Sequence, residues 1–385
     1  MNGIFQKLPS LASDYSGASS VLFEMGGMTV VCDAGSCFAT FLILDDPRWH
    51  PGPQRIFSAS LRERDIVLGF DKKLIKKIEN AHRAVGGSFL ALIGTPVPSI
   101  VGTDYNGICR ELEKKLSVGA VGIDTTGMAL YDLGQTRTYL KLVERFTDPE
   151  APACGDVHVI GATPLDMWDI NQTEDMLQFL RDCGAENPVV WGRPDSLESI
   201  RGASHARLNI AVSVSALPVV RKLETLYGTP YLVGFPMGEK DTACWKETVT
   251  AFLRGDGPAT LPAVAPGTGK RVLIVGEQVA SESLRRLLEG EFSCRADVSS
   301  YFTMDAALMR EEDAHMSEED SLARLMLERE RYDVVAADPL ILRLMGYQPD
   351  TMIQLPQIAV SSRIFWDKSP NCFGEKGSGY FGRLL

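Results

Sequence analysis

Short apolar runs alternate with amphipathic segments along most of the chain. In the segments 71–85, 104–116 and 172–182, apolar residues recur at intervals of three and four, which predicts amphipathic helices. Consecutive apolar residues between such segments predict buried strands. The predicted strands are 28–31, 89–93, 118–123, 157–160, 187–191, 208–212, 231–233 and 272–276. This alternation is typical of parallel sheets covered by helices, so we expect an α/β protein.

Two breaks divide this pattern into three stretches. The segment 147–152 contains two prolines and small residues, and 255–269 is rich in glycine and proline. Neither composition continues a helix or a strand. A chain of 385 residues also exceeds what one hydrophobic core usually covers. We therefore predict three α/β domains, with boundaries at 1–150, 151–265 and 266–385.

Charge and composition exclude several classes of protein. The formal net charge of −11 argues against binding to nucleic acid or to acidic membrane surfaces, which require concentrated lysine and arginine. The N-terminus shows no signal-peptide pattern, and no run of about 18 apolar residues occurs, so we expect a cytoplasmic protein. Eight cysteines in such a protein are expected to be thiols. The charged stretch 310–331 is interpreted as a solvated helix.

Several common catalytic and nucleotide-binding motifs are missing from the sequence. The strand predicted at 272–276 ends in Gly276, the one glycine present of the three that a dinucleotide fingerprint needs, and no phosphate-binding loop occurs. We therefore expect this chain to bind neither NAD nor ATP. No Gly-x-Ser-x-Gly motif is present, and His158 lies within a predicted strand, where a core role is favoured over a catalytic one.

Cys32 and Cys37 form the one pair of thiols that the pattern places on a loop after a buried strand. Thiolates held on a tight loop can bind an iron–sulphur cluster or zinc. Cysteine pairs at this spacing also arise by chance, and buried free cysteines are common. The spacing alone leaves both interpretations open.

The order of several motifs resembles the nitrogenase component 1 superfamily. The turn 14–18 and the loop 35–37 resemble the family's N-terminal Gly-Ala turn and its cysteine loop, and 93–104 resembles the segment that carries a further cysteine. The match continues in order through the segments 66–74, 122–128, 159–164, 234–238, 269–272 and 355–363. It extends from about residue 12 to residue 367.

The resemblance implies a fold and a mode of action. Family members have three Rossmann-like α/β domains with parallel sheets around a central cleft, and they work as pairs of homologous chains. A separate ATP-hydrolysing iron protein delivers electrons to a cluster at the interface between two chains, and the electrons then reduce a small-molecule substrate in the cleft. By motif position, the candidate cleft residues of this chain are Thr125, Thr126, Pro236 and Gly238.

The sequence departs from the family at the cluster ligands. Of three cysteine positions, only that of Cys37 is kept. The first would fall in the turn 13–19, which offers serines such as Ser19, and the third is occupied by Thr95. A neutral hydroxyl is a poor ligand for iron in such a cluster.

Cys32 offers a partial replacement, since it takes the position of the family's loop histidine. Two copies each of Cys32 and Cys37 would supply the four thiolates of a 4Fe-4S cluster shared between two chains. Asp33 is a further candidate ligand, and a heterodimer with a paralogous chain is the alternative to a homodimer. Two functions follow: an iron-protein-dependent reductase, or a non-catalytic scaffold or cofactor-binding subunit without a cluster.

Overall fold

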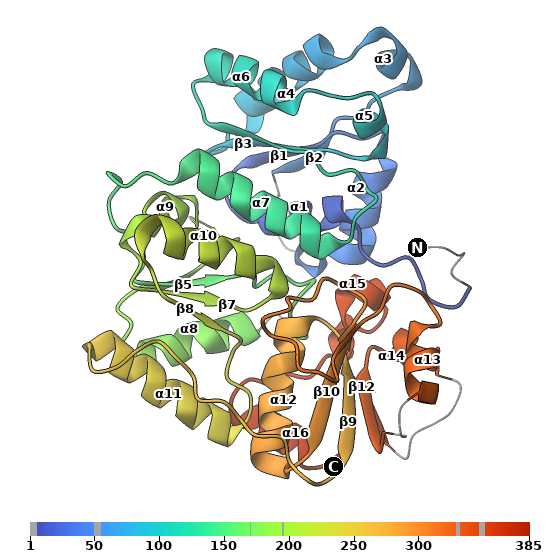
Figure 1. Ribbon diagram of the computed structural model, residues 1–385. Coiled ribbons are helices and arrows are strands. Elements are labelled where there is room, and N and C mark those ends of the chain that lie inside the picture. Colours follow the sequence, from blue (N-terminus) through green and yellow to red (C-terminus); the bar gives the residue numbers. More distant parts are fainter. Residues whose placement is uncertain (1–5, 50–54, 170, 195, 329–331, 346–350) are drawn as a thin grey trace. The chain divides into compact units, whose positions relative to one another are not determined.

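The computed structural model describes residues 6–49, 55–169, 171–194, 196–328, 332–345 and 351–385 (Figure 1). Its strands form three parallel sheets, and helices cover them. The α/β fold predicted from the sequence is therefore confirmed. No helix among the described residues combines the length and the apolar character that crossing a membrane requires.

The chain packs as two compact units that are not continuous in sequence. The first consists of Ala12–Gly155 and Val190–Ala206, and we call it the amino-terminal unit. The second consists of the segment ending at Leu11 together with Asp156–Val189 and Arg207–Leu385, and we call it the carboxy-terminal unit. Each of the three predicted domains contains one sheet, while the predicted boundaries between them stay a prediction.

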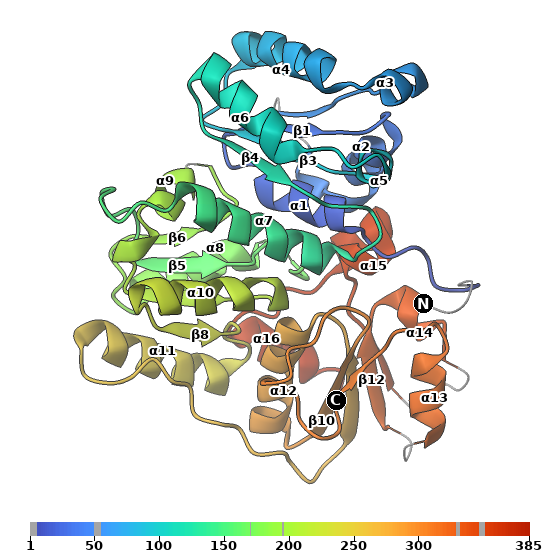
Figure 2. The same ribbon diagram turned by 45° about the horizontal axis from the view of Figure 1, so that its top comes forward.

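The sheet of the amino-terminal unit has the strand order β2-β1-β3-β4. Its strands are β1 (Met28–Val31), β2 (Ile56–Ser58), β3 (Leu90–Ile93) and β4 (Ala120–Ile123). Helices α4 (Asp71–Val85) and α6 (Tyr105–Leu116) cover one face, and α1 (Asp14–Leu22) and α7 (Tyr131–Phe146) cover the other (Figures 1 and 2). Shorter elements are α2 (Ser36–Thr40), the π-helix η1 (Phe41–Asp45), η2 (Pro47–Trp49), α3 (Glu63–Leu68), α5 (Pro96–Ile100), α9 (Ser196–Arg201) and η3 (Ala203–His205).

Two glycines let α1 and α7 approach each other at backbone distance. A Cβ atom on Gly17 of α1 would lie 2.0 Å from the carbonyl oxygen of Tyr131. A Cβ atom on Gly134 of α7 would lie 1.9 Å from the carbonyl oxygen of Asp14. Because both obstacles are backbone atoms, no side-chain movement can make room. These glycines therefore fix how closely the two helices pack.

The carboxy-terminal unit contains the other two sheets. One has the order β6-β5-β7-β8, with β5 (Val157–Ile160), β6 (Pro188–Val190), β7 (Leu208–Ala211), β8 (Tyr231–Val233), α8 (Gln172–Asp182), η4 (Val214–Ala216), α10 (Leu217–Tyr227) and α11 (Glu239–Arg254). The other has the order β11-β10-β9-β12-β13. Its elements are β9 (Arg271–Val275), α12 (Gln278–Phe292), β10 (Arg295–Ser300), β11 (Ala314–His315), α13 (Ser321–Glu328), β12 (Val334–Ala337), α14 (Pro339–Leu342), β13 (Thr351–Gln354), α15 (Ile358–Ser361), η5 (Ser362–Ile364), η6 (Trp366–Lys368) and α16 (Glu375–Phe381).

The buried carboxylate of Glu277 joins the two sheets of this unit. One oxygen accepts a hydrogen bond of 2.7 Å from the amide of Ala280 in the first turn of α12. The other accepts a hydrogen bond of 2.7 Å from the amide of Val214, which follows β7 of the other sheet. Glu277 therefore satisfies donors at the starts of two helical segments that belong to different sheets.

The interpretation of 310–331 as a solvated helix was wrong for its first half. Only Ser321–Glu328 is helical among its described residues, and Ala314–His315 is a short edge strand. Asp313 is buried, pairs with Arg285 at 2.7 Å and accepts a hydrogen bond from the amide of Val298. The alternation of charges along the sequence hid this ion pair, because charge pattern alone does not distinguish a solvated residue from a paired one.

Candidate functional site

The parallel strands of the amino-terminal unit bring the candidate ligand positions to one edge of the sheet. Val31 of β1 pairs in register with Ile93 of β3, and Ile93 pairs with Ile123 of β4. The residues that follow these strands are therefore neighbours. We call residues 32–37, 94–96 and 124–127 together the carboxyl edge.

Two threonine hydroxyls extend the hydrogen bonding of the sheet along this edge. The Thr95 hydroxyl donates to the Cys32 carbonyl at 2.7 Å. One strand further, the Thr125 hydroxyl donates to the Gly94 carbonyl at the same distance of 2.7 Å. Both threonines are buried. We call this pair of bonds the threonine ladder, and it fixes the ends of β1, β3 and β4 to one another.

Asp33 also has a structural role in this arrangement. One carboxylate oxygen accepts a hydrogen bond of 2.9 Å from the Phe38 amide in the first turn of α2. The other accepts a hydrogen bond of 2.6 Å from the Ser58 hydroxyl, which lies on β2. Gly35 adopts a φ of 116°, which lets the chain turn from β1 into α2. Asp33 thus holds α2 against the sheet, and both of its oxygens have partners.

Thr126 is held through its backbone by a buried carboxylate that the sequence did not single out. Asp14, the first residue of α1, accepts hydrogen bonds from the amides of Thr126 at 2.9 Å and Gly127 at 2.7 Å. The Asp14 side chain is fully buried. Asp14 lies in the turn 14–18 that resembles the family. The sequence does not indicate that its carboxylate accepts hydrogen bonds from the amides of Thr126 and Gly127.

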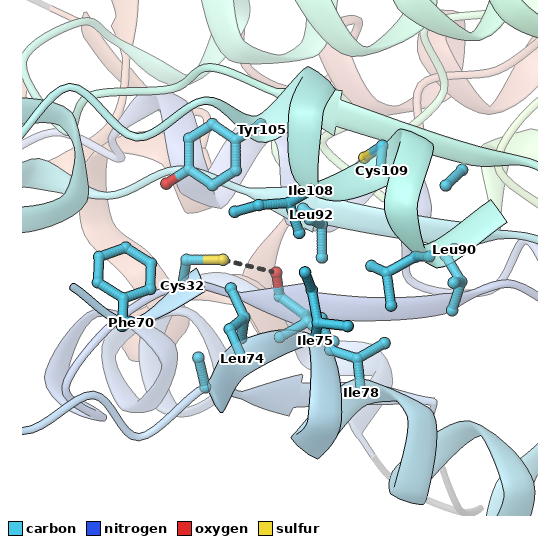
Figure 3. Close-up of a cluster of buried hydrophobic side chains, with 14 of the residues drawn as sticks. Cys32, Phe70, Leu74, Ile75, Ile78, Leu90, Leu92, Tyr105, Ile108 and Cys109 are labelled. Carbon is cyan, nitrogen blue, oxygen red and sulfur yellow. Dashed lines mark hydrogen bonds between the residues drawn. The ribbon is translucent and has the colours of Figure 1, made fainter. Parts of the chain in front are cut away.

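The Cys32 side chain lies in the hydrophobic core of the amino-terminal unit (Figure 3). It packs between the sheet and helices α4 and α6, in a cluster that includes Leu74 and Ile108. Its thiol makes a weak contact of 3.9 Å with the Val30 carbonyl and lies close to the hydroxyl of Tyr105 on α6. Burial raises the pKa of the Cys32 thiol far above its ordinary value, so the thiol is neutral at physiological pH.

Cys37 lies on α2, is half-buried, and has different neighbours from Cys32. Its thiol is close to the hydroxyl of Tyr15 on α1, and burial raises the pKa of Tyr15 to about 12. Burial first, and the charge of Asp33 next, raise the pKa of the Cys37 thiol. Cys32 packs on the face of the sheet covered by α4 and α6 (Figure 3), whereas the thiol of Cys37 lies beside Tyr15 of α1, and α1 covers the other face (Figure 1).

The serines of the turn 13–19 belong to α1 and its N-cap. The Ser16 hydroxyl donates to the carboxylate of Asp45 at 2.6 Å, and burial raises the pKa of Asp45 to about 6. Ser19 is buried, and its hydroxyl has no hydrogen-bond partner among the described residues. Asp45 was missed from the sequence, because it lies in a π-helix that no local pattern indicates.

Pro236 and Gly238 lie in the carboxy-terminal unit, whereas Thr125 and Thr126 lie in the amino-terminal unit. The Pro236 carbonyl accepts a hydrogen bond of 3.1 Å from the Gly374 amide, and the Gly238 amide donates to the Gly374 carbonyl at 2.8 Å. Gly238 has a φ of 80° and precedes α11. Both residues therefore pair with the backbone near α16, and a role in a substrate cleft stays a prediction.

The side chains of the carboxyl edge do not fit a four-iron cluster held by this chain alone. Such a cluster needs four soft ligands, usually thiolates. Across the residues that the structure describes, no group of three or more His, Cys, Asp or Glu side chains is arranged to hold a metal ion. Cys37 is half-buried, whereas Cys32 is fully buried. Ligation by Cys32 stays a prediction, and it would require the core to open.

Large apolar side chains are exposed on the segments that follow all four strands of this sheet. They are between 62% and 82% exposed. We call them the apolar rim, which consists of Ile43 on η1, Val67 and Leu68 on α3, Ile100 on α5, and Met128 after β4. Large exposed apolar side chains gathered at one edge mark sites of protein interaction.

Comparison with protein families gives one match that extends over most of the chain. The model of a family described as "Nitrogenase component 1 type Oxidoreductase" matches residues 13–353. A solved structure titled "Nitrogenase Cp1 at pH 6.5" superimposes with a TM-score of 0.73 over 100% of this chain and 93% of that chain, at 11% sequence identity. At this identity the superposition shows the likeness of the fold.

Curated relatives match about half of the chain. "Nitrogenase iron-molybdenum cofactor biosynthesis protein NifE" of Nostoc sp. is 27% identical over 191 residues, which are 47% of this chain and 38% of that protein. The protein of the same name from Mesorhizobium japonicum is 25% identical over 249 residues, 61% of this chain and 48% of that protein. The matched part therefore spans less than half of either relative.

Proposed function

The chain belongs to the nitrogenase component 1 type oxidoreductase family, and from this premise we propose that it is a cofactor-binding or scaffold subunit without a cluster of its own. One observation carries the proposal. At the position that matches the family's third cysteine, the Thr95 hydroxyl is buried and bonded to the Cys32 carbonyl. This residue stabilises the sheet edge where the family has a metal ligand.

The names of the curated relatives support the same function. They are described as proteins of iron–molybdenum cofactor biosynthesis, so an assembly role is represented among proteins similar to this chain. In such a role the metal-containing cofactor is cargo. Cys37 is the residue that we assign to hold it, because its thiol is half-buried at the carboxyl edge. Its raised pKa means that a bound metal cation would have to displace the thiol proton.

The apolar rim supports a second protein chain as a partner. We propose that the chain pairs with another component 1 chain, either a second copy of itself or a paralogue, because exposed side chains such as Leu68 and Ile100 gain from burial against a similar surface. An ATP-hydrolysing iron protein is the further partner that family membership suggests.

Cofactor retention tests the proposal. The full chain would be purified without oxygen from cells that make its cofactor, alone and with the paralogous chain, and its bound metals and absorbance spectrum measured. We expect wild type to retain a metal-containing cofactor that Cys37→Ala loses. Cys244→Ala, which removes a thiol of similar exposure in the other unit, is the matched control and should retain it. Equal metal content in wild type and Cys37→Ala would contradict the proposal.

A second candidate function is favoured by the thiol of Cys37, which lies on the loop that resembles the family's cysteine loop. In this function the chain accepts electrons from the iron protein through a shared interface cluster and reduces a small-molecule substrate. The measurement that separates the two functions is ATP-dependent oxidation of the reduced iron protein on addition of this chain. Electron uptake at a catalytic rate would favour the reductase over the scaffold.

A further inference from the structure

The position that matches the family's third cluster ligand is occupied by a group that stabilises the fold. Thr95 forms one bond of the threonine ladder, with its hydroxyl 2.7 Å from the Cys32 carbonyl oxygen. Thr125 forms the equivalent bond on the next strand. Because the two bonds repeat from strand to strand, they extend the hydrogen-bonding pattern of the sheet by one residue. The Thr95 hydroxyl cannot turn toward a metal without leaving the Cys32 carbonyl unpaired.

Side chains also pack around the remaining thiol. Tyr15 lies beside Cys37, and its ring is 3.5 Å from the place that a Cβ atom on Gly127 would take. The same Cβ atom would be 2.6 Å from the ring of Pro96, the residue after Thr95. Tyr15, Pro96 and Gly127 therefore fill the space between α1 and the ends of β3 and β4, on the side where Cys37 lies.

Cys32 cannot complete a ligand set in this arrangement. It is fully buried between the sheet and helices α4 and α6 (Figure 3), whereas the thiol of Cys37 lies beside Tyr15 of α1, which covers the other face of the sheet (Figure 1). Two copies of the chain therefore bring two available thiols, one Cys37 from each. A cubane cluster needs four ligands.

We infer that the carboxyl edge is a hydrogen-bonded edge that has replaced the family's interface cluster, so that two copies of this chain form no four-iron cluster from their own residues. Thr95 is then a structural residue, and Cys37 is the one half-buried thiol that the described residues of this edge offer to a group brought by another molecule. This inference rests on the proposed function and deepens it, because it names the residues that make the subunit free of its own cluster.

Iron reconstitution tests the inference directly. The purified full chain would be incubated with ferrous iron and sulphide without oxygen, desalted, and its iron, acid-labile sulphide and reduced-state EPR spectrum measured. We expect no stoichiometric iron and no cubane signal in wild type, Cys37→Ala or Cys32→Ala. About four irons for two chains, with a signal lost in both variants, would overturn the inference.

A pair of variants at Thr95 tests its structural side. Thr95→Ser keeps a hydroxyl, whereas Thr95→Val keeps the shape and removes it. We expect Thr95→Val to lower the urea midpoint and to speed hydrogen exchange at the amides near the end of β1, and Thr95→Ser to stay near wild type. If Thr95→Val has the urea midpoint and the hydrogen-exchange rates of wild type, the threonine ladder does not stabilise the sheet edge and the inference is wrong.

The two proposals fail separately. Suppose that wild type binds no stoichiometric iron on reconstitution, and that Cys37→Ala still retains the cofactor. Then the proposed cofactor role of Cys37 is wrong, and the inference that the edge holds no cluster is supported. If wild type assembles four irons through Cys32 and Cys37, the cluster-free edge falls together with the scaffold interpretation that depends on it. ATP-dependent electron uptake without bound iron would leave the edge intact and exclude the scaffold.

Discussion

Single buried polar groups determine much of the structure around Cys37. Asp33 holds α2, Asp14 holds the loop after β4, and Thr95 holds the end of β1. Each of these side chains bonds to a backbone group in a part-buried or buried place. Leaving such a group unpaired costs about 1–3 kcal/mol, so these residues matter to stability independently of any ligand.

Asp45 makes stability depend on pH in a defined direction. Burial raises its pKa from 3.8 to about 6, so the folded protein binds this proton more tightly than the unfolded chain does. The resulting stability is fully present below pH 3.8 and is lost as the pH rises through about 6. We expect the stability of wild type relative to Asp45→Asn to fall by roughly 2–3 kcal/mol over this range.

Urea unfolding of both proteins at several pH values between 4 and 7.5 measures this difference. Groups that titrate equally in the two proteins cancel, so the comparison isolates the carboxyl of Asp45. Ser16→Ala is a useful companion, because it removes the hydrogen bond that lowers this pKa and should steepen the fall. If the free energy of unfolding depends on pH in the same way in wild type and in Asp45→Asn, ionisation of Asp45 does not destabilise the fold and the prediction is wrong.

The different positions of Cys32 and Cys37 predict different reactivity. In the native protein, iodoacetamide should modify Cys37 and leave Cys32 unmodified, since alkylation requires access and a thiolate. We expect a difference in rate of at least about tenfold, because Cys32 becomes accessible only when the core opens. Mass spectrometry of labelled peptides gives both rates, with Cys244 as a half-buried reference. Equal rates would mean that the cluster around Cys32 opens readily.

The residue-level roles at the carboxyl edge were only partly predictable. The resemblance to the family gave Cys32, Cys37, Asp33 and Thr95 as candidate ligands or neighbours of one cluster, and the parallel pairing of β1 and β3 brings the loops that carry them to one edge. The sequence could not determine which face each thiol points to, since Cys32 extends the alternation of β1 while the turn at Gly35 places Cys37. That difference depends on backbone dihedral angles that no side chain in the motif specifies.

Among the elements, the packing of α1 against α7 depends on direct backbone contact, which no pattern in the sequence indicates. Gly17→Ala should lower the free energy of unfolding by several kcal/mol, because its Cβ atom would lie 2.0 Å from a carbonyl oxygen. Gly290→Ala in α12 is the matched control. Its Cβ atom would find no atom closer than 3.8 Å, and alanine favours the helix by about 1 kcal/mol.

Thermal or urea unfolding of the two variants checks this prediction, with circular dichroism to verify that both fold. A mild effect of Gly17→Ala, similar to that of Gly290→Ala, would show that α1 and α7 can separate without loss. In that case Asp14 would also hold the loop 126–127 less rigidly than its hydrogen bonds to that loop indicate.

Long amphipathic helices and buried strands were predicted more accurately than short helical segments. The helices α4 and α8 and the strands β1 and β5 have the bounds that the pattern predicted. The segments around Cys37, which include α2, η1 and α5, have five residues each, too few for a hydrophobic period to develop. They are held by tertiary hydrogen bonds, so local sequence contains little information about them.

At the scale of the whole molecule, the N-terminal segment belongs to the unit that contains most of the C-terminal half. The carboxylate of Glu319 accepts hydrogen bonds from the backbone amides of Gln6, Lys7 and Leu8. These bonds hold the Glu319 pKa below its usual value. We expect Glu319→Ala to release the segment and to increase hydrogen exchange at these three amides, with little effect on the amino-terminal unit.

Hydrogen exchange followed by mass spectrometry measures this release peptide by peptide. Glu318→Ala is the matched control, since the neighbouring carboxylate pairs with Arg324 and bonds none of these amides through its side chain. Unchanged protection of residues 6–8 in Glu319→Ala would show that other contacts hold the segment.

The discontinuity of the two units has a consequence for synthesis. The amino-terminal unit includes Val190–Ala206, so a ribosome must extend the chain past residue 206 before this unit can close. By then β5 and most of β6, which belong to the other unit, are already made. One edge of β5 stays unpaired until β7 has been made, and the N-terminal segment lacks its partner until Glu319 has been made. A nascent chain of this protein therefore exposes open strand edges through the middle of translation, the stage at which a chaperone has most to protect.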